Sequence, residues 1–194
     1  MSENIIIADA DYVDSVAFNL IVNFERMLNR ALPKADFAQW AVCVALDGGV
    51  REGKNDVQVV LVHDKQREEM AHFEPGNFSH ILNAKAFNDA HLGEFTVTSV
   101  ATNDTISKET YFEEVMETLL HHDEVKRVML IPDSETGTVY DRLRRLLRHA
   151  DDDTKRITLF AMEPMPGGNF RQELLGYSLM SALGIKSEEI NQKI

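Results

Sequence analysis

Two aspartates, Asp9 and Asp11, directly follow an apolar run from Ile5 to Ala8, and their position makes them the first candidates for chemistry. A continuous apolar run of this kind predicts a central parallel strand that is buried on both faces. In an open α/β sheet, ligands bind in the crevice outside the carboxyl ends of the strands. We therefore expect both carboxylates to face such a crevice.

Acidic side chains also follow three further predicted strands. They are Asp64 next to His63, Asp133 with Glu135, and Glu163. Clustered carboxylates repel one another, and their hard oxygen atoms suit Mg²⁺ or Mn²⁺. The sequence thus predicts a divalent-metal site with Asp9, Asp133 and Glu135 as ligands and Asp11 in support. The competing interpretation is that these acids cap the helices that follow the strands.

The elements that must position these residues alternate between strands and helices. Strands are predicted in the first part of residues 4–14 and at 57–63, 94–100, 128–133 and 156–163. Helical spacing of apolar residues predicts helices after Asp14, from Ser107, from Thr136 or Thr138 to about His149, and from Asn169 to Gly184. Two short helices are expected within residues 65–93, and periodicity leaves residues 38–46 open between helix and strand.

This alternation predicts a mostly parallel sheet with helices on both faces. We expect one α/β domain over residues 1–194, a Rossmann-like three-layer sandwich of about five strands.

Composition narrows the possible partners and compartments. A formal net charge of -12 disfavours nonspecific binding to nucleic acid or to an anionic membrane. No apolar run is long enough to span a membrane, and the N-terminus does not resemble a signal peptide. The single cysteine, Cys43, lies in an apolar run and predicts an inert buried thiol, so we expect a cytoplasmic location. No GxGxxG or P-loop spacing signals a nucleotide or flavin cofactor.

Two weaker signals concern anions. The helix around residues 140–149 carries Arg142, Arg145 and His149 on one stripe, with Arg144 and Arg148 adjacent. Such a stripe either contacts RNA phosphates or, more commonly, forms a solvated face paired with acids. The segment 164–169, PMPGGN, precedes a predicted helix and has the composition of an anion-binding turn.

The order of parts resembles the PIN and NYN family of metal-dependent ribonucleases. Asp9 matches the family's first acid, Glu117 falls where its helix acid lies, and Asp133 with Glu135 matches its later turn. The resemblance implies a PIN-like fold and makes Glu117 a fourth metal ligand. The turn departs from the family pattern at Pro132, where a small residue is expected, and at Thr136, where an aromatic residue often follows.

The segment Asp9-Ala10-Asp11-Tyr12-Val13 also resembles the DxDx[TV] motif of the haloacid dehalogenase family. That resemblance implies that Asp9 is a phosphate-accepting nucleophile and Asp11 a general acid. The helix predicted directly after the motif leaves little room for that family's flap, and no later lysine or GDxxxD motif is recognised.

At the scale of the whole chain, five segments are similar to the recurring blocks of an uncharacterised family of conserved bacterial proteins, which implies no activity. They are ADADYVD, IVNFERML, LDGGVREG, LFAMEPMPG and LLGYSLMSALGI. Two hypotheses follow for function: a metal-dependent, nuclease-like phosphoesterase, or a non-catalytic binding or oligomerising protein on the same scaffold. The sequence does not decide whether the protein is an enzyme, and it identifies no partner beyond a possible second copy of the chain.

Overall fold

The structure, a computed structural model that describes residues 1–149 and 154–192, is organised around a seven-stranded sheet. The strand order is β5-β6-β3-β1-β7-β8-β9. The strands are β1 (Asn4–Asp9), β3 (Asn55–Asp64), β5 (Lys85–Asp89), β6 (Gly93–Thr102), β7 (Arg127–Ile131), β8 (Arg156–Ala161) and β9 (Arg171–Leu174). Two short strands, β2 (Ala35–Asp36) and β4 (Phe73–Glu74), pair separately.

Helices connect most of the strands. They are α1 (Ala10–Leu28), α2 (Phe37–Asp47), α3 (Lys108–Leu120), α4 (Val139–Leu146), α5 (Leu175–Ala182) and α6 (Ser187–Asn191). A single π-turn, η1 (Phe78–Leu82), and a 3₁₀ turn, η2 (Leu147–His149), complete the described helical segments.

The strand order reverses direction at β1. The chain adds β3 and β6 on one side of β1, and later adds β7, β8 and β9 on the other, all of them parallel. Only β5 runs antiparallel, at the edge beside β6. Sheets with this doubly wound order open a crevice at the reversal point, outside the carboxyl ends of the two strands that flank it. Here those strands are β1 and β7.

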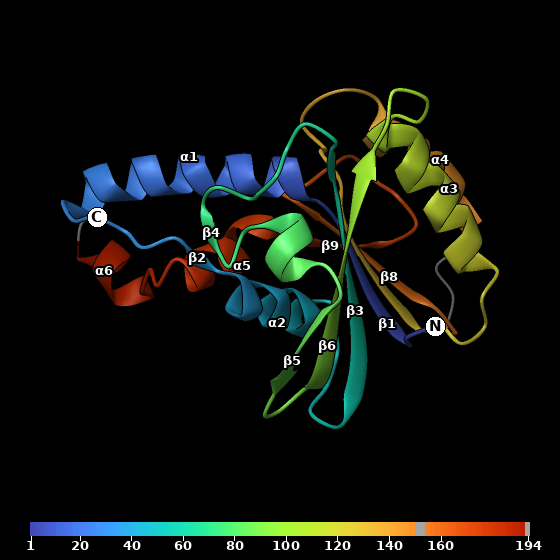
Figure 1. Cartoon of the computed structure of the whole chain (residues 1–194), viewed down its shortest axis with the longest axis horizontal. Coiled ribbons are helices and arrows are strands. Elements are labelled where there is room, and N and C mark those ends of the chain that lie inside the picture. The colour runs from blue at the N-terminus through green and yellow to red at the C-terminus, as the bar shows by residue number, and fades with distance from the viewer. Residues whose placement is uncertain (150–153, 193–194) are drawn as a thin grey trace.

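Helices cover both faces of the sheet, as Figure 1 shows, with α1, α2 and α5 on one side and α3 and α4 on the other. Alternating side chains of β1 reach the two faces. Ile6 and Ala8 belong to the core beneath α1, α2 and α5, whereas Ile5 and Ile7 belong to the core beneath α3 and α4. The two cores therefore share the central strands, which explains why β1 is apolar at successive positions.

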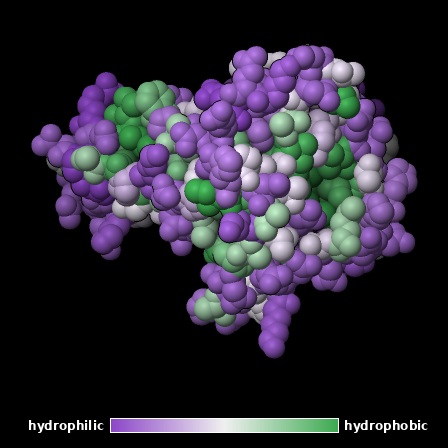
Figure 2. Space-filling model, viewed as in Figure 1, coloured by the Kyte–Doolittle hydropathy of each residue, from purple (hydrophilic) through white to green (hydrophobic). Residues whose placement is uncertain are grey.

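Helix α1 runs beyond the sheet, and its far end lies beside α6 (Figure 1). The guanidinium of Arg30, just after α1, donates two hydrogen bonds of 2.9 Å to the carboxylate of Glu189 in α6. Figure 2 shows apolar surface over α1, where Phe18, Val22 and Met27 are exposed. This helix is thus apolar on more than the side that faces the core.

The expected α/β class, with a mostly parallel sheet between helices, is confirmed. The five predicted strands correspond to β1, β3, β6, β7 and β8, and the open segment 38–46 is helical within α2. The sheet has seven strands because two polar edge strands add to it. Edge strands need no apolar alternation, since only one side of the strand pairs and much of it faces solvent.

Two helix predictions are wrong for this reason. Residues 171–174 were expected at the start of the last helix but form β9, pairing with residues 158–161 of β8. Residues 85–87 were expected at the end of a short helix over residues 77–87 but belong to β5, which pairs with β6, and only residues 78–82 of that stretch are helical, as η1. In both segments, long-range pairing overrides the local preference. Residues 65–72 form turns and a single bridge in place of the other expected short helix.

In the described part of the chain, no helix combines the length and the apolar character needed to cross a membrane.

Candidate functional site

Asp9 is the last residue of β1 and also the N-cap of α1. Its Oδ1 accepts a 3.0 Å hydrogen bond from the backbone N–H of Tyr12, which stabilises the first turn of the helix. The helix begins directly at Ala10, so Asp11 already lies in the first turn. Asp9 is only 5% exposed. The capping interpretation of Asp9 is therefore correct, and one of its oxygens is used in this way.

Lys108, at the start of α3, connects both aspartates. Its ammonium donates to Asp9 Oδ1 at 3.0 Å and to Asp11 Oδ2 at 2.6 Å. The same oxygen of Asp11 accepts a 2.7 Å hydrogen bond from the backbone N–H of Asp64, at the end of β3. Ser107 caps α3 by accepting from Thr110 N–H, which fixes where Lys108 begins the helix. Asp11 thus joins the start of α3 and the end of β3 to the end of β1.

Burial and charge shift the pKa values of Asp9 and Lys108. Burial raises the pKa of Asp9 above its ordinary value, and the Lys108 charge and the Tyr12 N–H offset that rise only in part. Burial lowers the pKa of Lys108, but the two carboxylates outweigh burial, so the Lys108 pKa is raised overall. Lys108 consequently stays protonated at neutral pH and supplies a fixed positive charge at the crevice.

Asp133 lies across the crevice, in the turn that follows β7. Its Oδ1 accepts hydrogen bonds of 3.1 Å from the backbone N–H groups of Glu135 and Thr136, and its Oδ2 accepts from the Thr136 hydroxyl. Glu135 accepts a 2.7 Å hydrogen bond from the Tyr12 hydroxyl. Burial, followed by this contact with Glu135, raises the pKa of Tyr12, which keeps the phenol protonated as the donor.

A cavity of about 190 Å³ lies between these groups. Its polar side is lined by Asp9, Lys108, Glu109, Asp133 and Thr136, and Phe112 and Val139 form an apolar wall. It lies beyond β1 and β7, the two strands at which the order of the sheet reverses. This is the crevice that the sequence predicts, and we call it the β1–β7 pocket.

The predicted site residues divide into two groups. Asp9 and Asp133 line the β1–β7 pocket, Asp11 adjoins it through Lys108, and Glu135 is held beside it by Tyr12. Glu117 is exposed on α3, nine residues after Lys108, which places it about 13 Å further along the helix axis. The structure does not bring Glu117 to the pocket.

The remaining strand-end residues take other positions. Glu163 is exposed after β8, and the buried ring of His63 stacks on Phe78 at a centroid distance of 3.8 Å. Among the residues that the structure describes, no three His, Cys, Asp or Glu side chains are grouped closely enough to hold a metal ion. Three carboxylates line the β1–β7 pocket, those of Asp9, Glu109 and Asp133. Glu109 already accepts from the Thr138 N–H and hydroxyl and lies 3.6 Å from the Arg142 guanidinium, so Asp9 and Asp133 are the candidates for a metal.

Sequence reasoning missed Lys108 and Tyr12. Lys108 follows the predicted cap Ser107, so its place at a helix start was visible, but lysines are common at such exposed positions. Its partners lie 99 and 97 residues earlier in the chain, and no local pattern reports contacts of that range.

The fold and the site together define a doubly wound α/β protein with a charged pocket at the reversal point of its sheet. The chain belongs to the Family of unknown function (DUF6621), whose model matches residues 1–190. This agrees with the resemblance to an uncharacterised family, whereas the nuclease resemblance gains no support and rests on the order of elements alone. Searches among curated proteins and among solved structures found no match to this chain.

Proposed function

We propose that the β1–β7 pocket binds a phosphoester and that the protein hydrolyses it with the help of Mg²⁺ or Mn²⁺. The observation that carries the proposal is that Asp9, Lys108 and Asp133 line one pocket at the reversal point of the sheet. Such crevices are where open α/β sheets bind their ligands. The Lys108 ammonium, with the carboxylates of Asp9 and Asp133, fits a phosphate oxygen and a divalent cation side by side, whereas the third lining carboxylate, Glu109, is paired with Arg142.

Two carboxylates are enough for this kind of cation. Mg²⁺ keeps several of its waters and is commonly held by one or two carboxylates together with substrate phosphates. When bound, the ion would polarise the phosphoryl oxygen and activate water. Asp9 and Asp133 would hold it, while Lys108 keeps Asp9 and Asp11 in place and attracts the phosphate. Asp11 and Glu135 act as supporting acids through their bonds to Lys108 and Tyr12.

Lys108 favours a second candidate, a phosphatase of the haloacid dehalogenase type. The sequence alone offered no later lysine for that resemblance, but Lys108 contacts both aspartates of the DxDx[TV] segment. In this mechanism a carboxylate oxygen of Asp9 attacks phosphorus, the bond to the leaving alcohol breaks, and Asp11 gives the alcohol its proton. Water then hydrolyses the aspartyl phosphate and regenerates Asp9.

The first test is thermal unfolding with and without Mg²⁺ or Mn²⁺. A ligand that binds only the native state stabilises it by about 1.4 kcal/mol at tenfold excess over its Kd, which is about 3–6 °C for a chain of this size. We expect this rise in wild type and not in Asp9→Asn. Asp36→Asn is the matched control, because Asp36 also caps a helix by accepting a 3.0 Å hydrogen bond from Gln39 N–H.

No shift of wild type at millimolar metal, or an equal shift in Asp9→Asn, would contradict the metal-dependent proposal and favour a non-catalytic binding protein. The two hydrolytic mechanisms separate by trapping the intermediate. Borohydride reduction of an aspartyl phosphate converts Asp9 to homoserine, which mass spectrometry detects, whereas direct attack of water on the substrate leaves Asp9 unmodified. p-Nitrophenyl phosphate and its bis ester, assayed separately, distinguish monoester from diester substrates.

A further inference from the structure

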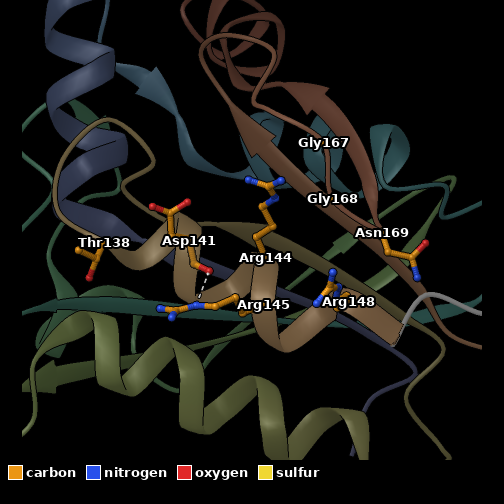
Figure 3. Close-up of a pocket in the computed structure, with 8 residues that line it drawn as sticks. All are labelled: Thr138, Asp141, Arg144, Arg145, Arg148, Gly167, Gly168 and Asn169. Carbon is orange, nitrogen blue, oxygen red and sulfur yellow. Dashed lines mark hydrogen bonds between the residues drawn. The ribbon is translucent and has the colours of Figure 1, made fainter.

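A second, larger cavity of about 820 Å³ lies between α4 and the loop that follows β8. Arg144 and Arg145 of α4 and Arg148 of the η2 turn line it together with Asp141 and Thr138, and residues 167–169 line its other side. Figure 3 shows the Arg144 side chain pointing from α4 toward the loop that carries Gly167 and Gly168. The two weak anion signals of the sequence, an arginine-rich helix and a Pro-Gly-Gly turn, thus converge on one cavity. We call it the arginine pocket.

The arginines of α4 and η2 divide into two sets. Arg142 faces α3, where its guanidinium lies 2.7 Å from Glu113 and 3.6 Å from Glu109. Arg144 and Arg148 are exposed and make no ion pair within residues 1–149 and 154–192. Arg145 donates only to the backbone oxygen of Asp141, at 3.3 Å, as the dashed line in Figure 3 marks. Among the residues that the structure describes, three guanidinium groups therefore share this cavity with one lining carboxylate, that of Asp141, in a chain whose net charge is -12.

The facing loop offers further donors. Within the described residues, the backbone N–H groups of Gly167, Gly168 and Asn169 have no acceptor. The loop is nevertheless held in place on both sides of these residues. The Tyr140 hydroxyl of α4 donates to the Pro166 carbonyl, and the Gln172 side chain exchanges two hydrogen bonds, of 2.9 and 3.2 Å, with the Met165 backbone. These anchors hold the loop and leave the three N–H groups without a partner among the described residues.

We propose that the arginine pocket binds the phosphate group of a small, nucleotide-sized ligand. Guanidinium groups recognise phosphate by paired, charge-assisted hydrogen bonds, and unpaired backbone N–H groups add anion-binding capacity. The volume falls in the range of small-molecule sites. The net charge of -12 decides against a long nucleic acid, because a polyanion extending beyond the pocket would meet an acidic surface.

The arginine pocket and the β1–β7 pocket are lined by neighbouring residues at the start of α4. Thr138 lines the former and the next residue, Val139, lines the latter. The proposal goes beyond hydrolysis, since a phosphate ligand can bind here whether or not the β1–β7 pocket is catalytic. We therefore expect Asp9→Asn to retain binding at the arginine pocket, which separates a failure of this proposal from a failure of the proposed function.

The test is titration calorimetry of the full chain with adenosine 5′-monophosphate, inorganic phosphate and adenosine. We expect the two phosphate-bearing probes to bind and adenosine to fail, because it lacks the anion. Arg144→Gln with Arg148→Gln should weaken binding by about tenfold or more, since two charge-assisted contacts are lost. Arg26→Gln with Arg51→Gln removes the same charge from exposed positions outside both pockets and should leave binding unchanged.

A second measurement uses wild type alone and does not depend on the folding of a variant. Titration with inorganic phosphate should shift the amide NMR signals of Gly167, Gly168 and Asn169 more than those of α1. The proposal is overturned if neither phosphate probe binds at millimolar concentration, if both double variants bind equally, or if adenosine binds as well as its monophosphate. Binding to single-stranded RNA that tightens steadily with length would overturn it in favour of a nucleic-acid surface.

Discussion

At the scale of residues, Lys108 is the group on which the candidate site depends. Asp9 and Asp11 are both poorly exposed carboxylates near the end of one strand, and their negative charges would repel each other in the absence of a cation. The ammonium of Lys108 allows both to remain close to each other. Even so, burial keeps the Asp9 pKa above its ordinary value, so ionised Asp9 is held at a cost in stability.

The first prediction concerns the pH dependence that this raised pKa produces. Below about pH 4, the ordinary aspartate pKa, Asp9 is protonated in both the native and the unfolded state. Between that value and the raised native pKa, the native state holds more protons, so the free energy of unfolding falls as pH rises. Asp9→Asn abolishes this contribution. The stability of the variant relative to wild type should therefore increase through this window and level off above it.

Urea denaturation of both proteins at a series of pH values measures the difference. Lys108→Met provides the check on its cause, because removing the ammonium raises the Asp9 pKa further and extends the window to higher pH. That variant should also lose about 3 kcal/mol, the lower end for breaking a buried ion pair, since the Lys108 side chain is 27% exposed. A stability difference between Asp9→Asn and wild type that does not change with pH would show that burial does not perturb Asp9.

At the scale of elements, α3 carries Lys108 at one end and depends on another lysine at the other. Lys155, which is 7% exposed, donates to the backbone carbonyls of Leu119, Leu120 and His122 at 2.6, 3.2 and 2.8 Å. Helices end with carbonyls that have no partner within the helix. Lys155, which lies just before β8, therefore fixes the end of α3. It also fixes the orientation of this helix, which positions Lys108.

The second prediction is that Lys155→Met destabilises the protein by about 2–4 kcal/mol, because buried carbonyls lose their donor. Lys126→Met is the matched control. Lys126 is exposed and donates to one carbonyl, that of Asp123, at 2.6 Å, so water can replace it at little cost. Denaturation midpoints of the two variants measure the difference, and equal losses would contradict the capping role of Lys155.

At the scale of the whole molecule, the sheet joins two hydrophobic cores. Trp40, the only tryptophan, is fully buried in the core beneath α1, α2 and α5. Leu143 of α4 is fully buried in the core on the opposite face. Because β1 contributes alternate side chains to both, neither core can be lost without exposing the strand that the other requires.

The third prediction is that unfolding is a single transition across both cores. Leu143→Ala should cost about 2–5 kcal/mol, as large-to-small changes in a core do. It should also lower the midpoint of the Trp40 fluorescence transition by the same amount as that of far-UV circular dichroism, although Trp40 lies on the other face. A fluorescence midpoint that stays at the wild-type value while the dichroism midpoint falls would mean that the two faces unfold independently.

The sequence by itself determined the central strands and the edge at which the site lies. Continuous apolar runs such as Ile5 to Ala8 must be buried, and an aspartate that ends such a run must lie at the end of a strand. For the same reason Asp9 and Asp133 were placed correctly at one pocket. Whether a segment is buried depends on its own side chains, so the pattern of apolar residues within that segment is enough to predict it.

Only the tertiary structure decided which segments meet. It turned residues 171–174 from an expected helix into β9, brought Lys108 to two aspartates almost a hundred residues away, and placed Gly167 and Gly168 opposite the arginines of α4. It also left Glu117 on an exposed face of α3, away from the pocket. Pairing and contact depend on interactions between distant segments, and the pattern within a segment carries no record of its partner.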